Sequence, residues 1–181
     1  MTKEVKALAI DTDMASLRRL SRRFAIKDDD INELVLNMKR SMTAAWTPGV
    51  GLAAIQIGIP IRVAIYYKVT EAGKFQRTLI NPTIVASNTL TACTGEGCLS
   101  IPHQLYTTWR YNTIEFTHEV DGQLVTERAT GREAQIVQHE IDHMNGILCC
   151  DRAKKPVEPG RNEPCSCGSN VKFKKCCGRN F

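Results

Sequence analysis

The sequence predicts an α+β fold in which antiparallel strands pack around helices. Strand-like segments fill the middle of the chain between two helical segments of different character, and a strong hairpin signal joins two of the strands. A parallel fold would instead alternate strands and helices regularly, and this chain does not. With 181 residues, 43% of them hydrophobic, the chain can form one domain with a substantial core.

The first helix is predicted from about Asp28 to Ala45. Three consecutive aspartates stand at its start, where negative charge is favourable. Pro48 and the glycines beside it end the pattern. Apolar residues recur along the helix at three- and four-residue steps, at Ile31, Leu34, Val35, Met38 and Met42.

Four strands are predicted from runs of apolar, β-branched and aromatic residues. Residues 62–67 and 75–80 form one pair around a glycine-containing turn. Residues 113–120 and 123–129 form a second pair, because Asp121-Gly122 between them is typical of a two-residue hairpin turn.

A second helix is predicted after Gly131, and it carries the pattern H-E-x-x-H. His139 and His143 are four residues apart, so on a helix both imidazoles point to one side and can bind one ion. Glu140 can approach the open coordination position and take a proton from metal-bound water. Since two of the four histidines in the chain have this spacing, we favour a metal site over a surface helix.

A catalytic metal normally needs a third protein ligand. Residues 144–148 contain no histidine, so this ligand must come from elsewhere. Cys98 is the first choice, because a thiolate would complete a Cys/His/His set with one position left for water. A buried, unreactive cysteine is the alternative reading. Spacing leaves three rival ligands open: Cys93, His103 and His118.

Three segments, in order, resemble the signature motifs of the peptide deformylase family. Residues 49–56 (G-V-G-L-A-A-I-Q) resemble G-x-G-[LI]-A-A-x-Q, and residues 96–100 are E-G-C-L-S, as in the second motif. Residues 138–143 (Q-H-E-I-D-H) resemble Q-H-E-x-D-H. Every specified position matches, and the resemblance covers roughly residues 15–152.

This resemblance implies a peptide-deformylase-like fold, with antiparallel strands packed around a central metal-binding helix. It also implies a hydrolase that removes the formyl group from the N-formylmethionine of nascent polypeptides and releases formate. Cys98, His139 and His143 would hold the catalytic ion, with Fe²⁺ as the first expectation and Zn²⁺, Co²⁺ or Ni²⁺ as alternatives. Metal-bound water would be the nucleophile, and Glu140 the general base and then the general acid.

The same resemblance assigns the groups that bind the substrate. The side-chain amide of Gln56 and the backbone N–H of Leu99 would donate to the oxyanion that forms on the formyl group. A structural hydrogen bond is the alternative role of Gln56, since its neighbours are mostly apolar. The peptide would pair with the chain like an added strand and contact Gly49, Val50, Gly51 and Gly97.

One departure from the family and two supporting contacts are also predicted. Leu105 stands where many bacterial members carry an arginine near the peptide, which affects how residues after the methionine are held. Glu96 is expected to pair with Arg110. Asp142 is expected to support the metal ligands without binding the ion.

The end of the chain has a different character. Residues 152–181 carry a net charge of +6, and the rest of the chain carries −1. Four cysteines in two close pairs can enclose a structural zinc ion, at Cys165, Cys167, Cys176 and Cys177. This segment resembles the SEC-C motif, and the zinc would supply its folding free energy. We therefore expect a catalytic domain at 1–151, a linker at 152–160 and a SEC-C-like zinc motif at 161–181.

Partners and location follow from the same features. Formylated nascent peptides would be the substrate, and the basic zinc tail would dock on a ribosome or another protein. No stretch reaches the ~18 apolar residues of a membrane span, and the N-terminal residues show no secretory signal, so we expect a cytoplasmic protein with no membrane partner. The oligomeric state and the metal stay open. Two other functions remain: another H-E-x-x-H hydrolase such as an aminopeptidase, and an inactive deformylase-like binding protein.

Overall fold

The computed structural model of the chain describes residues 10–25, 31–153, 160–164 and 171–175. The helices are α1 (Met14–Leu17), α2 (Ile31–Ala44) and α3 (Gly131–Met144), and the 3-10 helices are η1 (Ala54–Ile57), η2 (Cys149–Ala153) and η3 (Phe173–Lys175). The strands are β1 (Gly51–Ala53), β2 (Val63–Thr70), β3 (Gly73–Ile80), β4 (Thr83–Cys98), β5 (Ile101–Val120) and β6 (Gln123–Thr130). In the described residues they form two antiparallel sheets, in the orders β1-β2-β3 and β4-β5-β6.

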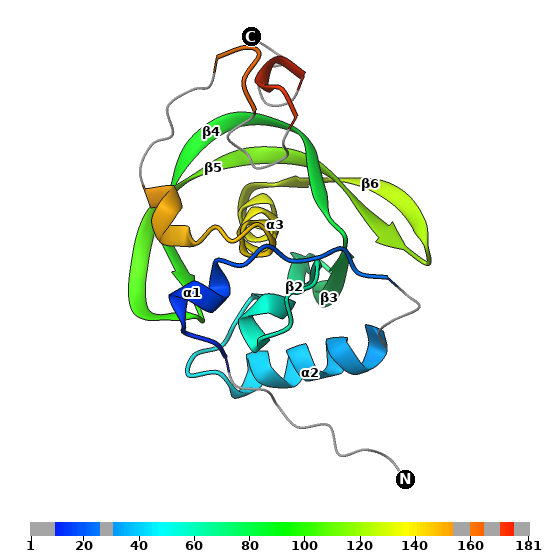
Figure 1. The fold of residues 1–181 in the computed structure, drawn as a ribbon, viewed down its shortest axis with the longest axis vertical. Helices are drawn as coiled ribbons and strands as arrows, with labels where there is room; N and C mark the ends of the chain where they lie inside the picture. Colours follow the sequence, from blue (N-terminus) through cyan, green and yellow to red (C-terminus); the bar gives the residue numbers. More distant parts are fainter. Residues whose placement is uncertain (1–9, 26–30, 154–159, 165–170, 176–181) are drawn as a thin grey trace.

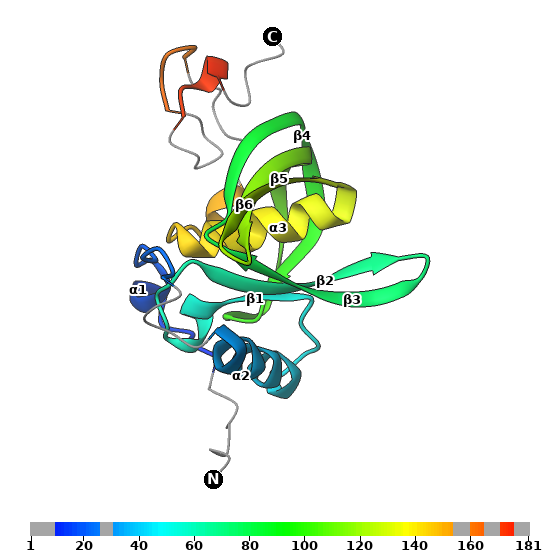
Figure 2. The ribbon, with the colours of Figure 1, turned by 90° about the vertical axis from the view of Figure 1, so that its right-hand side faces the viewer.

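The two sheets enclose α3 from opposite sides. Strands β4, β5 and β6 arch over this helix (Figure 1), and the β1-β2-β3 sheet lies beneath it (Figure 2). Helix α2 packs on the other face of the β1-β2-β3 sheet. Helix α3 therefore lies in the interior of the main body, with strands on both sides.

Side chains of β2 pack on both faces of its sheet, because successive side chains of a strand point to opposite faces. Val63 and Ile65 pack in the cluster that includes α2, whereas Ala64 and Tyr66 pack in the cluster around α3. Both faces are buried over the first four residues of the strand, so residues 63–66 form an unbroken apolar run rather than an alternating one.

The α+β prediction is confirmed, and both predicted strand pairs are present. Asp121 and Gly122 have φ angles of 50° and 78°, the positive values that a type I′ turn requires and that glycine adopts without strain. The β2–β3 hairpin is longer than predicted, since β2 continues to Thr70 and β3 begins at Gly73.

Other elements were not predicted: α1, β1, β4 and the first half of β5. The pairing of β4 with β5 shifts register between Ile84 and Ala86 and again between Cys93 and Glu96. Such bulges break the two-residue alternation on which strand prediction depends. Strand β1 has three residues and α1 has four, too few to show a period.

The main body extends beyond the predicted start of the linker. Arg152 and Ala153, which the sequence analysis assigned to the linker, belong to η2, and Arg152 donates to the carboxylate of Asp142. In the tail, Phe173 packs against the main core. The predicted zinc ligands lie outside the described residues: Cys165, Cys167, Cys176 and Cys177. Within the described ranges, no helix is long and apolar enough to span a membrane.

Candidate metal centre

Helix α3 carries polar side chains into the interior, because strands cover it on both sides. Gln138 fixes the helix to β5: its amide nitrogen donates to the Tyr111 carbonyl at 2.8 Å, and its carbonyl accepts from the Tyr111 N–H at 2.9 Å. Glu140 and His143 are buried on the same helix. A buried polar side chain usually has a hydrogen-bond partner or a function. These residues therefore indicate where on α3 a functional site lies.

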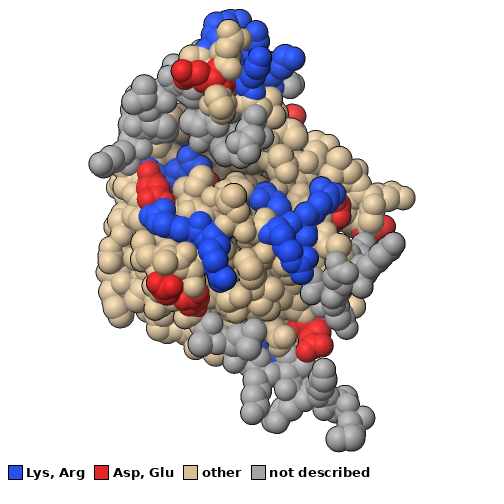
Figure 3. Space-filling view, viewed as in Figure 1, with Lys and Arg blue, Asp and Glu red and all other residues tan. Residues whose placement is uncertain are grey.

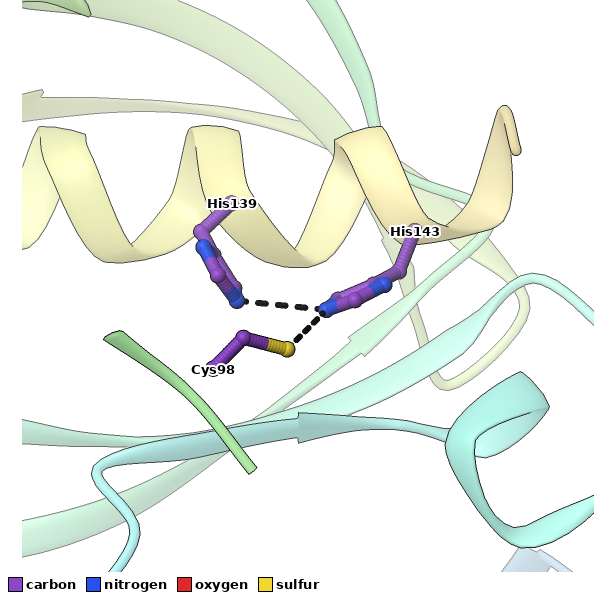
Figure 4. Close-up of side chains that lie close together, drawn as sticks. All are labelled: Cys98, His139 and His143. Atoms are coloured by element: carbon purple, nitrogen blue, oxygen red, sulfur yellow. Dashed lines mark hydrogen bonds between the residues drawn. The ribbon is translucent and has the colours of Figure 1, made fainter. Parts of the chain in front are cut away.

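One sulfur and two imidazole nitrogens converge beside α3. Cys98, the last residue of β4, places its Sγ 3.3 Å from Nε2 of His143 (Figure 4). Nε2 of His143 lies 3.2 Å from Nε2 of His139, and the two rings meet nearly edge to face, 4.8 Å apart at their centroids. The ligand atoms of all three residues lie within 4.8 Å of one another. The structure thus brings together the three expected ligands.

The three rival ligands have other surroundings. His118 is buried with its Nε2 2.9 Å from a carboxylate oxygen of Glu127. His103 lies with its ring against Trp46. Cys93 is half-buried, and the described residues bring no metal-binding cluster together around it.

Burial and neighbouring groups shift the pKa values of the three side chains in different directions, and contact with Glu96 raises that of His139. Burial lowers the pKa of His143 well below its ordinary value, so this imidazole is neutral and can offer a lone pair. The adjoining Cys149 thiol and burial raise the pKa of the Cys98 thiol, so a thiolate at this depth needs a nearby positive charge. A thiol and two imidazoles at this spacing are a donor set that fits iron or zinc.

Glu96 orients the first histidine of the pair. Nδ1 of His139 donates to Oε1 of Glu96 at 2.7 Å, which leaves Nε2 facing the cluster. The sequence analysis missed this contact. Glu96 and Cys98 are buried on either side of the exposed Gly97, so the spacing of two in a strand could have placed both side chains toward α3.

A buried network holds Glu96 in turn. Arg110 donates to Glu96 through Nε at 3.0 Å and Nη2 at 2.6 Å, as expected, and its Nη1 binds Asp142. Arg152 donates to Asp142 at 2.6 Å. Asp142 therefore supports the ligands only at a distance, through Arg110 and Glu96. His139 and Arg110 hold the pKa of Glu96 well below its usual range, although burial acts in the opposite direction.

The carboxyl group of Glu140 lies buried against the backbone of Gly51. Burial raises the pKa of Glu140 to about 7, and its Oε2 has no hydrogen-bond partner among the described residues. A Cβ at position 51 would lie 2.3 Å from Oε1 of Glu140, closer than any real contact. Glycine at position 51 thus leaves room for the carboxyl group of Glu140 where it lies, a role that the sequence analysis did not give.

Gln56 makes the structural hydrogen bond that was weighed as its alternative role. Its Oε1 accepts from the N–H of Ala53 at 2.9 Å, which fixes the side chain in place. Its Nε2 then points toward the cluster, 3.6 Å from Sγ of Cys98 and 3.2 Å from Oγ of Ser100. Leu99 follows Cys98 in the tight turn between β4 and β5, and its carbonyl accepts from Nε1 of Trp46.

A cavity of about 480 Å³ opens onto this site. Cys98, His139 and Glu140 line it, and so do four residues expected to contact a peptide: Gly49, Val50, Gly51 and Gly97. Strand β1 is an edge strand in the described sheet and pairs with β2 on one side. Leu105 lies at the cavity with 75% of its surface exposed.

Comparison with known families gives two matches. The family model described as polypeptide deformylase matches residues 7–158, and the SEC-C motif matches residues 161–179. A curated relative, the peptide deformylase of Brucella suis (strain 1330), is 38% identical over 153 residues, which cover 83% of this chain and 86% of that relative.

Solved structures agree with these matches. A probable peptide deformylase from Synechococcus phage S-SSM7 is 36% identical with a TM-score of 0.71, over 81% of this chain and 99% of that protein. A class I type b peptide deformylase from Acinetobacter baumannii, bound to Met-Ala-Ser, is 27% identical with a TM-score of 0.72, over 82% of this chain and 99% of that one.

Proposed function

This chain belongs to the peptide deformylase family and removes the N-terminal formyl group from nascent peptides, and we propose that Cys98, His139 and His143 hold the divalent metal ion that this family requires. The observation that carries the proposal is the convergence of the three ligand atoms within 4.8 Å, next to the buried carboxyl group of Glu140. The family match favours a deformylase over the two alternative functions, an aminopeptidase and an inactive deformylase-like binding protein.

The donor set limits the choice of ion. One thiolate and two neutral imidazoles suit Fe²⁺ or Zn²⁺, and also Co²⁺ or Ni²⁺. We propose Fe²⁺ as the first choice, as the resemblance implies. When bound, the ion would act as a Lewis acid on the formyl carbonyl and lower the pKa of its bound water to about 7.

Glu140 would move the proton during hydrolysis. Its unpartnered Oε2 can accept a proton from the attacking water as the bond between the formyl carbon and water forms. It would then give this proton to the amine nitrogen as the C–N bond breaks, so that formate and a free N-terminus are released. A pKa of about 7 suits a group that must both accept and donate near neutral pH.

Two donors would stabilise the negative charge on the formyl oxygen. The Nε2 group of Gln56 is held toward the cluster by the bond from Ala53 to Oε1, so it needs little reorganisation to donate. The N–H of Leu99 is the second proposed donor. The peptide would lie along the free edge of β1, in contact with Gly49, Val50, Gly51 and Gly97.

Replacement of Gly51 by alanine is expected to lower kcat about 100-fold without loss of metal, because the new Cβ would displace the carboxyl group of Glu140. Formate release and metal content measure the two effects. In a chain that already carries Glu140→Gln, the same substitution should cause little further loss. A full additional loss there would show that Gly51 acts through something other than Glu140.

One assay tests the proposed function. Formate release from formyl-Met-Ala-Ser should be catalysed by the anaerobically purified chain, and unblocked Met-Ala-Ser should be left intact. An aminopeptidase would instead release methionine from the unblocked peptide. Failure to release formate with a filled metal site would overturn the proposal.

The tail has a separate proposed role. We propose that its four cysteines bind a structural zinc ion, as the SEC-C match supports. Lysine and arginine side chains gather at this end of the molecule (Figure 3), where the described basic residues are Arg161, Lys172, Lys174 and Lys175. We propose that this charge favours docking on a ribosome, which carries the nascent substrates, and that the enzyme acts in the cytoplasm. Sedimentation with ribosomes at low salt, with and without residues 156–181, tests the choice between a ribosome and another protein.

A further inference from the structure

Exposed apolar side chains gather at the mouth of the cavity. Trp46, Val50 and Leu105 are 53%, 42% and 75% exposed, and all three line the same cavity, the first two from the loop between α2 and β1 and the third from β5. Apolar groups that gather on a surface next to a binding site are typical of a contact with a ligand. The mouth therefore offers an apolar surface that the cleavage chemistry does not use.

Trp46 is held in place at this mouth. Its Nε1 donates to the Leu99 carbonyl at 3.1 Å, and its ring centroid lies 4.9 Å from that of His103, with the rings inclined at 45°. His103 has a φ of +63°, a left-handed conformation that a residue other than glycine adopts at some cost. The fixed indole thus presents a preformed face, and little entropy is lost when a ligand packs on it.

Few charged side chains lie at the mouth of the cavity. Glu96 and Glu140 line the cavity but are buried, and each belongs to the chemistry described above. Arg132, at the start of α3, is the exposed guanidinium among the described lining residues, and it donates to Gln135 at 2.7 Å. The side chain at position 105 is an uncharged leucine. It therefore cannot bind a backbone carbonyl or an acidic group of the peptide as a cation would.

From these contacts we propose that Trp46, with His103 and Leu105, forms a specificity subsite for an apolar or aromatic side chain in the two residues that follow formyl-methionine. The proposal rests on the proposed function and deepens it. Under that function, the formyl end of the peptide would lie at the metal cluster, and its next residues would lie along the free edge of β1. A peptide in that position would come close to the Trp46–His103 pair, since the pair lines the same cavity as Gly49, Val50 and Gly51.

Two peptide series test the subsite, formyl-Met-X-Ser and formyl-Met-Ala-X, with X as Phe, Ala, Asp or Lys. In at least one series the wild-type kcat/KM should be about tenfold higher for Phe than for Ala, Asp or Lys. Trp46→Ala should bring the ratio of Phe to Ala close to one, and Trp46→Phe should preserve it. Phe75→Ala, on the remote β2–β3 hairpin, is the matched control and should change neither ratio nor rates.

A loss of rate in Trp46→Ala that is equal for all X would overturn the subsite, because it would mean that Trp46 acts only by holding the Leu99 turn. The absence of any preference in the wild-type chain would overturn it as well. Trp46 fluorescence gives a readout without turnover: the product Met-Phe-Ser should shift the emission of the wild type, and not that of Trp46→Phe. If no peptide releases formate but this shift is present, the proposed function fails and the subsite stands.

Discussion

Replacement of Glu140 by glutamine is expected to lower kcat by roughly 10²–10⁴-fold while the chain keeps its catalytic metal. Glutamine has nearly the same shape but cannot accept the proton from water or carry it to the leaving amine. Because Glu140 is not a member of the Cys98–His139–His143 cluster that would bind the ion, metal content should stay near that of the wild type. Anaerobic purification, metal analysis and formate release measure both effects on one sample.

Glu133→Gln is the matched control for this substitution. Glu133 lies on the same helix, and its carboxylate binds Tyr66 and Lys68 away from the metal cluster. This variant should keep both metal and turnover. A Glu140→Gln chain that retains more than about a tenth of wild-type kcat would contradict the assignment of Glu140 as the group that moves the proton.

About two metal ions per chain are expected, one in each proposed site, and each site should empty independently of the other. Cys98→Ala should remove the catalytic ion and abolish turnover, since two histidines alone do not form a stable catalytic site. Cys176→Ser should remove the tail zinc and leave deformylation of short peptides intact. The tail is too short to bury a core by itself, so it should also lose its fold with the zinc.

Cys93→Ser provides the control for these two variants, because Cys93 lies outside the cluster and should keep both ions. Metal analysis of the four proteins, with wild type included, gives the count directly. If Cys98→Ala kept its full metal complement, the proposed ligand set would be wrong. If Cys176→Ser kept its full metal complement, the tail would not be a four-cysteine zinc site.

Local patterns in the sequence predicted the elements whose structure depends on near neighbours. The Asp121-Gly122 turn follows from two residues that accept positive φ, and the spacing of His139 and His143 follows from the helical repeat. Strand β4 was not predicted, since its bulges against β5 interrupt the alternation of buried and exposed residues.

The sequence by itself determined the family and predicted the two histidines of α3 as ligands with the carboxylate beside them, because these residues lie within one helical turn or within contiguous motifs. Only the tertiary structure showed that Cys98, and not Cys93, His103 or His118, lies beside the two histidines, and only it showed Glu96 on His139 and Gly51 against Glu140. These contacts join β4 and β1 to α3, and a contact between residues 45 positions apart depends on how the two sheets pack around that helix. No local period in the chain encodes that packing.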